Sequence, residues 1–277
     1  MNSSNLNRYP VTAILGGIIL LAALMTVPMT SAFAEVDDIN NFSLSVGFFV
    51  ADRKNGTRID ASNGDRGTEV DLEDDLGLES TNRVFRIDGY YRFNDTHRID
   101  FSWFDLSRSA TNIIDKDIQW NDTLFRIDMQ IDSIFDLDIY KVAYTWSFMR
   151  REKGFLGLTA GLYIMDFSTT LAATTLGARE SAGTTAPLPV VGLRGKYELS
   201  ERWSLRASSE VFAYKFDESD GLLIDVYAGV DYQLSNRTAI GAGLNAVKFD
   251  IDFTLTDFTG NVDWGYAGAL VFLKFDF

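Results

Sequence analysis

The sequence predicts an all-β fold, a transmembrane antiparallel up-and-down β-barrel whose strands extend above the membrane. Three observations lead to this fold class. Apolar and polar residues alternate with period two from about residue 42 onward, the spacing of a sheet with two different faces. Short and long polar connections alternate, as in hairpins joined in series. Beyond residue 34 no apolar run is long enough for a spanning helix, so only closed strands could satisfy the backbone in lipid.

The first residues predict a cleaved export signal rather than part of the fold. A polar start carrying Arg8 is followed by the apolar run Ala13–Met25, which is shorter than the roughly 20 residues of a membrane helix. Ala32-Phe33-Ala34 supplies the small-x-small pattern that a signal peptidase reads. We therefore expect a signal peptide at 1–34 and one barrel domain at 35–277. Because the chain has no cysteine, we expect neither a lipoprotein anchor nor a disulfide.

Each predicted strand carries an apolar face of about 9–11 residues, the length that a tilted strand needs to cross a bilayer. The clearest faces are Phe42, Leu44, Val46, Phe48 and Val50; Tyr140, Val142, Tyr144, Trp146 and Phe148; Ile224, Val226, Ala228, Val230, Tyr232 and Leu234; and Ala267, Ala269, Val271, Leu273, Phe275 and Phe277. Tight turns are predicted at 94–96, 150–154, 200–202 and 235–237, and longer polar loops near 53–81, 109–124, 170–187, 216–221 and 256–261. This pattern predicts about ten strands with both chain ends in the periplasm, and counts of eight or twelve stay open.

Aromatic residues gather at the turn ends of the apolar faces. They are Phe42, Tyr91, Phe93, Trp146, Phe148, Tyr197, Trp203, Tyr232, Phe275 and Phe277. Strands favour aromatic residues in general, but gathering on one face and at one end favours a girdle at a membrane interface.

Several segments resemble known bacterial proteins. The terminal stretch Leu270–Phe277 resembles the C-terminal signature of bacterial outer-membrane barrels, which implies recognition by the barrel-assembly machinery. Phe85–Phe93 followed by His97–Phe101, and Tyr140–Phe148 with Gly157–Leu162, resemble a group of uncharacterised proteobacterial outer-membrane β-barrel proteins. The resemblance covers about the middle half of the barrel. It implies the cell outer membrane of a Gram-negative bacterium, with outer-membrane lipid and lipopolysaccharide as surroundings, and it implies no activity.

Fixing the lipid face fixes the lumen face by parity, and the lumen face is charged. Its predicted bases are Arg86, Arg92, Lys141, Arg194, Lys196, Arg206 and Lys274, and its predicted acids are Asp88, Asp100, Glu198, Glu210, Asp225, Asp231 and Asp276. Because the net charge of the chain is −14, the excess acid must lie outside this balanced layer. We expect charge pairs that largely fill a narrow lumen. A thin water-filled pore lined by the same groups remains the alternative.

Above the membrane the two faces exchange polarity. Inward positions become apolar at Phe104, Leu106, Ile114, Ile118, Trp120, Phe125, Ile127, Met129, Ile131, Tyr163, Met165, Phe167, Phe212, Tyr214, Phe216, Phe249, Ile251, Phe253, Leu255, Val262, Trp264 and Tyr266. Water replaces lipid outside, so the buried face switches sides without a bulge or register shift. This predicted core is either packing alone or a cavity for a small apolar ligand among Phe125, Phe167, Phe212, Phe253 and Trp264.

The sequence predicts no enzyme and no cofactor. Its only histidine, His97, lies beside a predicted periplasmic turn, whereas outer-membrane proteases of the omptin type, phospholipases and deacylases rely on a histidine. The acidic run Glu69, Asp71, Glu73, Asp74 and Asp75 lacks the ligand spacing of a Ca²⁺ loop, so we expect a solvated loop. No catalytic, cofactor-binding or metal-binding residue is therefore assigned.

The predicted function is a structural or surface-interaction role for a barrel whose lumen is largely filled by charge pairs. The alternative is a narrow pore or a binding barrel for a small apolar solute, with that solute as a partner. Nucleic acid is not an expected partner, because the acidity of the chain would repel phosphates.

Overall fold

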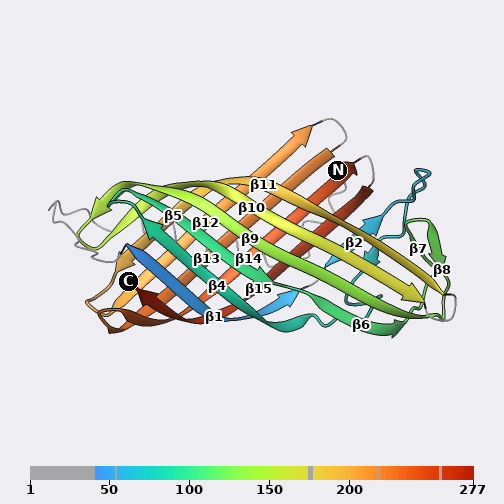
Figure 1. The fold of residues 1–277 in the computed structure, drawn as a ribbon, viewed down its shortest axis with the longest axis horizontal. Helices are drawn as coiled ribbons and strands as arrows, with labels where there is room; N and C mark the ends of the chain where they lie inside the picture. The colour runs from blue at the N-terminus through green and yellow to red at the C-terminus, as the bar shows by residue number, and fades with distance from the viewer. Residues whose placement is uncertain (1–40, 54, 174–176, 217–218, 256–257) are drawn as a thin grey trace.

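The computed structural model describes residues 41–53, 55–173, 177–216, 219–255 and 258–277, so the predicted signal peptide lies outside the described residues (Figure 1). Within these ranges no helix is long and apolar enough to cross a membrane. The strands are β1 (Phe42–Arg53), β2 (Gly56–Ile59), β3 (Val70–Asp71), β4 (Thr81–Arg92), β5 (His97–Asp105), β6 (Arg108–Ile113), β7 (Ile118–Trp120), β8 (Thr123–Phe125), β9 (Gln130–Arg151), β10 (Gly154–Ala173), β11 (Ala178–Glu198), β12 (Trp203–Phe216), β13 (Ser219–Ser235), β14 (Thr238–Leu255) and β15 (Phe258–Asp276).

Ten antiparallel strands form the wall of a closed barrel. Their order is β1-β4-β5-β9-β10-β11-β12-β13-β14-β15, and β1 pairs with β15 to complete the ring. The predicted up-and-down barrel of ten strands is confirmed. Closure depends on Gly47 of β1, because a Cβ atom there would lie 2.3 Å from the carbonyl oxygen of Val271. Only glycine lets the first and last strands approach this closely.

The predicted lipid face is confirmed. On β9, Tyr144, Trp146 and Phe148 are each more than two-fifths exposed, while Lys141 and Thr145 on the opposite face are buried. Val226, predicted to face lipid, departs from this: it has outward parity between the inward residues Asp225 and Tyr227, but it is buried at 5% exposed. It lies outside the main interior cluster. A belt of exposed apolar side chains around a charged interior is the arrangement of a barrel that spans lipid.

The exchange of polarity above the belt is also confirmed, with corrections. β6 continues the register of β5 on β9, since Asp105 pairs with Asp138 and Arg108 with Phe135. The predicted inward residues Phe104, Leu106, Ile114, Ile131, Tyr163, Met165, Phe167, Phe249, Ile251, Val262, Trp264 and Tyr266 are buried, and Met129 and Phe212 pack against them. The side chains of Tyr214, Phe216, Phe253 and Leu255 lie outside the described part of the structure.

Four predicted wall positions were wrong, namely Ile127, Ile118, Trp120 and Phe125. Ile127 is half exposed, because the chain turns between β8 and β9 and Asp128 takes a left-handed φ of 66°. Ile118 and Trp120 are buried as expected, but they lie in the separate hairpin β7–β8 rather than in the wall. In that hairpin Ile118 and Trp120 belong to the same buried apolar cluster as Ile59, Val70 and Leu72.

Three predicted polar loops contain ordered strands instead. The predicted loop 109–124 holds most of β6, all of β7 and the start of β8. Most of 170–187 is strand, because β10 runs to Ala173 and β11 begins at Ala178. In the predicted loop 53–81, β2 pairs with β15 and β3 pairs with β2, and Ile59, Val70, Leu72, Leu76 and Leu78 are buried. We call residues 55–80 and 114–125 the cap. Its two parts are joined where the amide of Thr68 donates to the carbonyl of Gln119 at 2.8 Å.

Candidate functional site

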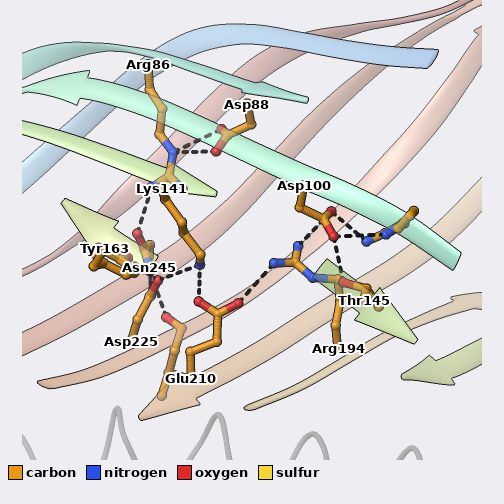
Figure 2. A network of polar contacts seen from close by, with 12 residues as sticks. Arg86, Asp88, Asp100, Lys141, Thr145, Tyr163, Arg194, Glu210, Asp225 and Asn245 are labelled. Atoms are coloured by element: carbon orange, nitrogen blue, oxygen red, sulfur yellow. Dashed lines mark hydrogen bonds and ion pairs between the residues drawn. The ribbon is translucent and has the colours of Figure 1, made fainter. Parts of the chain in front are cut away.

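The lumen holds one continuous network of polar side chains, shown in Figure 2. Its members come from nine of the ten wall strands, all but β1. They are Arg86 and Asp88 (β4), Arg98 and Asp100 (β5), Lys141 and Thr145 (β9), Tyr163 (β10), Arg194 (β11), Glu210 (β12), Asp225 (β13), Asn245 (β14) and Tyr266 (β15). We call this set the lumen network. It crosses the barrel from wall to wall.

One half of the lumen network is centred on Asp225. Asn245 donates to the Asp225 carboxylate at 2.6 Å and accepts a 2.8 Å hydrogen bond from Arg86. Lys141 lies 3.3 Å from Asp225, and the Tyr163 hydroxyl donates to the same carboxylate. These partners satisfy a carboxylate that is almost completely buried, as a buried charge requires.

The other half continues through Glu210 to Asp100. Glu210 forms ion pairs with Lys141 and, at 3.1 Å, with Arg194. Arg194 lies 3.6 Å from Asp100, which also pairs with Arg98 at 2.9 Å and accepts a 2.6 Å hydrogen bond from Thr145. The chain of contacts therefore passes from Arg86 to Arg98 without a break.

Local sequence builds part of this arrangement. Residues two apart on one strand face the same side. Four ion pairs of the described lumen have this spacing: Arg86–Asp88, Arg98–Asp100, Lys196–Glu198 and Lys274–Asp276. All fourteen predicted inward charges are buried or partly buried. Arg98 is an eighth base that sequence reasoning missed, although it shares the parity of Asp100.

A cavity of about 100 Å³ lies among these charges in the periplasmic half of the lumen. All eight inward bases line it, together with the acids Asp88, Asp100 and Asp225. Its volume corresponds to roughly seven to ten water molecules. The cavity can hydrate the charges, but it is too small to be a wide channel.

A layer of aromatic side chains lies on the outer side of the lumen network. We call Phe49, Phe104, Tyr163, Trp264 and Tyr266 the aromatic layer, and each is at most 1% exposed. The ring of Tyr266 is central, with ring-centroid distances of 4.9 Å to Phe49 and 5.3 Å to Trp264. Its hydroxyl donates to Asn245 at 2.9 Å, and the Arg86 guanidinium lies 4.8 Å from the Phe104 ring. The two layers are therefore in direct contact.

The acidic run of the cap is mostly structural rather than solvated. Glu73 pairs with Arg108 at 2.6 Å and accepts a 2.7 Å hydrogen bond from the amide of Asn55. Asp71 and Asp75 accept backbone hydrogen bonds within the run, and Asp75 also pairs with Lys116 at 2.6 Å. Glu69 and Asp74 are exposed. Among the described residues, no group of three or more potential ligands could hold a metal ion.

Burial around the Glu73–Arg108 contact shifts the pKa values of two side chains, Glu73 and Arg53. Burial raises the pKa of Glu73 above its ordinary value, despite the opposing hydrogen bond from Asn55 and the contact with Arg108. Burial and the neighbouring Arg108 charge lower the pKa of Arg53 to about 10. The Arg53 guanidinium donates to the carbonyl of Leu106 at 3.1 Å. The cap is joined to the wall by the Glu73–Arg108 ion pair and by the hydrogen bond from the Arg53 amide to the Ser80 carbonyl.

The apolar residues singled out in the sequence meet only in part around a cavity. Phe167 and Trp264 line an apolar cavity of about 20 Å³ with Phe135, Leu137, Met165, Thr184, Ala186, Phe249 and Val262. Phe125 is buried in the cap, and Phe212 packs on the apolar core. The side chain of Phe253 lies outside the described part. The cavity as it stands accommodates about one water-sized group.

His97 lies at the turn end of β5, as predicted. Its Nδ1 contacts the hydroxyl of Tyr144, and the two rings stack with an interplanar angle of 20°. The sole histidine is therefore at the opposite end of the barrel from the cap.

No family model matches the sequence, and no curated protein is detectably similar to it. Solved structures share its fold. The outer membrane protease OmpT from Escherichia coli matches 90% of this chain and 100% of its own, with a TM-score of 0.57 and 11% identity. Ail, the attachment invasion locus protein of Yersinia pestis, matches over 84% of this chain and 97% of its own, with a TM-score of 0.37 and 15% identity. The P. putida toluene transporter TodX matches over 86% of this chain and 90% of its own, with a TM-score of 0.32 and 10% identity.

At 11% identity, the likeness to OmpT establishes the fold alone. The closed ten-stranded wall, the exposed apolar belt and the aromatic girdle at one end agree with it. The chain has the fold of an outer-membrane β-barrel, and its lipid-facing belt places it in the cell outer membrane.

Proposed function

We propose that this chain is a non-enzymatic, non-conducting barrel that holds a folded acidic cap at the cell surface for interaction with other molecules. The observation that carries the proposal is the pair of successive layers in the lumen. The lumen network crosses the barrel, and the aromatic layer packs directly on it.

An ion crossing the lumen would have to pass both layers. A path through the lumen network would have to separate ion pairs such as Lys141–Glu210, in which both side chains are buried. Leaving a buried charge without its partner costs about 3–5 kcal/mol. An ion leaving the cavity toward the outside would next meet the buried rings of Phe49, Phe104 and Trp264. Loss of hydration there is expensive, which supports a closed lumen.

The surface around the cap and the outer wall carries mostly acids. The exposed carboxylates are Asp52, Asp65, Glu69, Asp74, Glu79, Asp105, Asp115, Asp117, Asp122, Asp128, Asp136 and Asp166, and the exposed bases are Arg66, Arg83, Arg126 and Arg179. Such a surface attracts cationic partners over about one Debye length, roughly 8 Å at physiological salt. The cap is also anchored to the wall through Glu73 and Arg108, so it presents these charges on a fixed frame.

Single-channel recording in planar bilayers tests the closed lumen. We expect no discrete conductance from wild type, and steps from Tyr266→Ala combined with Lys141→Ala, which thins both layers. Each protein is first shown to be folded on a denaturing gel, where the unheated sample must migrate faster than the heated one. Stable unitary steps in wild type would refute the proposal.

A binding comparison tests the surface role. Removing two cap charges with Glu69→Gln and Asp74→Asn should weaken binding of a polylysine probe to the protein in nanodiscs. The matched control removes two exposed charges at the periplasmic turns, Glu152→Gln and Glu201→Gln. Equal effects of the two pairs would argue against the cap as the interacting surface.

A further inference from the structure

The barrel wall is not paired along its full height. β11 and β12 pair from Glu198–Ser204 only as far as Val191–Val211. Beyond that point β11 continues to pair with β10 up to Ala178, and β12 continues with β13 up to Phe216. Figure 1 shows the outer ends of β11 and β12 diverging. We call the opening between residues 178–190 of β11 and residues 212–213 of β12 the lateral gap.

Prolines in β11 account for the start of the lateral gap. Pro187 and Pro189 pair with Ile164 and Leu162 of β10. Proline has no N–H and is accommodated in a sheet where its nitrogen faces away from the paired neighbour. The nitrogens of both prolines therefore face β12, which removes two successive donors from that side. The sequence itself ends the pairing here.

The edge of β11 is also the uncharged sector of the outer wall. Residues 181–191, SAGTTAPLPVV, carry no charge in a chain with 39 acids and 25 bases. On the neighbouring strands, by contrast, Asp105 of β5 pairs with Asp138 of β9, and Asp138 pairs with Asp166 of β10. An apolar molecule would meet a repelling polar surface there, whereas the edge of the lateral gap is uncharged from residue 181 onward, beyond Arg179 and Glu180 at its outermost end.

The level of the lateral gap matches the upper limit of the lipid belt. Val191 and Val211, the last paired residues, face outward and are 60% and 41% exposed. An open sheet edge is not tolerated in hydrocarbon, so the gap begins where the outer leaflet meets the polar interface. Lipid chains of that leaflet are the apolar molecules closest to it.

Behind the edge lies an apolar interior. Thr184 and Ala186 of β11 line the cavity of about 20 Å³ together with Met165, Phe167 and Trp264. Leu188 is buried beside them, and Phe212 of β12 packs partly buried against the same cluster. The cavity has room for one methyl-sized group. The space for a longer molecule is the uncharged edge that leads to it.

We propose that the lateral gap admits a single acyl chain from the outer leaflet. The terminal methyl lies in the cavity beside Phe167 and Trp264, and the remaining methylenes lie along the β11 edge. The site goes beyond the surface role proposed above and does not depend on whether the lumen conducts.

Photolabelling in nanodiscs tests the site. A fatty acid with a diazirine near its methyl end is added and irradiated, and the modified residues are mapped by mass spectrometry. Labelling is expected at Met165, Phe167 and Thr184. Labelling of the exposed residues Leu158 and Leu244 by the same probe reports ordinary contact with the lipid face.

Two variants sharpen the test. Ala186→Phe fills the cavity and should lower interior labelling at least fivefold, while the matched Ala160→Phe on the lipid face of β10 should leave it unchanged. Pro187→Val with Pro189→Val restores two N–H donors that face β12, and so should extend the β11–β12 pairing. This double variant should also lower interior labelling, although it places no additional ring in the cavity. The proposal is overturned if wild type is labelled only on its outward face, or if interior labelling persists in these folded variants.

Discussion

Lys141 joins the two halves of the lumen network, so its removal has a cost that can be worked out. Its ammonium group pairs with Glu210 and, at 3.3 Å, with Asp225. The Lys141 side chain is 8% exposed, and those of Glu210 and Asp225 are 1% and 5% exposed. Lys141→Met keeps the aliphatic stem and removes the charge, which leaves two buried carboxylates with one partner fewer each.

Removing one member of a buried ion pair costs about 3–5 kcal/mol, because the other charge stays buried. Here Glu210 keeps Arg194 at 3.1 Å, and Asp225 keeps the 2.6 Å hydrogen bond from Asn245. We therefore expect the lower end of the range, about 3 kcal/mol, or roughly a hundredfold change in the unfolding equilibrium constant.

Urea unfolding in lipid vesicles, followed by tryptophan fluorescence, measures this free energy. Lys153→Met, at an exposed turn position, is the matched control and should change stability little. Adding Glu210→Gln and Asp225→Asn to Lys141→Met should recover most of the loss, since neutral groups no longer lack a counter-ion. A loss below about 1 kcal/mol for Lys141→Met, or no recovery in the triple variant, would refute the reasoning.

Three further predictions follow from the same structure. Gly47→Val places a side chain against the Val271 carbonyl and should abolish the fast-migrating unheated form on a gel, whereas Ser45→Val, also inward on β1, should retain it. Burial raises the pKa of Glu73 above 4.5, so the attachment of the cap should weaken as the pH rises from about 4.5 through the raised pKa. The measurement is amide exchange of residues 55–80, corrected for its intrinsic rate. Glu73→Gln should remove this pH dependence, and an unchanged profile in the variant would contradict the reasoning. Lys141→Met alone should stay silent in planar bilayers, since the aromatic layer is intact; discrete steps would show that the lumen network is the only barrier.

Alternation along the strands was enough to predict the wall and most of the lumen. Lipid accepts only one face of each strand, so a residue such as Tyr144 assigns Lys141 and Thr145 to the interior by parity alone. The same rule would have found Arg98, two residues before Asp100, had the parity been carried to the end of β5. The pairing of a given acid with a given base depends on how the barrel closes, because partners such as Lys141 and Asp225 are far apart in sequence.

The cap and the lateral gap could not be predicted in this way. Val70, Leu72 and Leu76 lie among carboxylates, so the segment reads as polar and solvated. Their burial depends on contacts with residues distant in the chain, such as Glu73 with Arg108. The local signs of the lateral gap are the uncharged run 181–191 and, within it, Pro187 with Pro189. The meaning of the prolines depends on which neighbouring strand their nitrogens face.

The side chains of the lumen reinforce the wall where the backbone ladders are shortest. β4–β5 and β11–β12 have seven and eight residue pairs, fewer than the other neighbouring strands of the wall. Across β4–β5, the Arg86 guanidinium lies 4.8 Å from the Phe104 ring and that of Arg98 lies 4.7 Å from the Tyr90 ring, contacts that stabilise when desolvated.

Across β11–β12 the corresponding contact is the ion pair of Arg194 with Glu210 at 3.1 Å. Pairs within one strand, such as Arg98–Asp100, neutralise charge but cannot hold neighbours together. Glu210 is therefore expected to hold the seam just below the lateral gap. Glu210→Gln should speed amide exchange first along residues 191–198 and 204–211, and uniform acceleration around the barrel would mean that the network stabilises the fold as a whole instead.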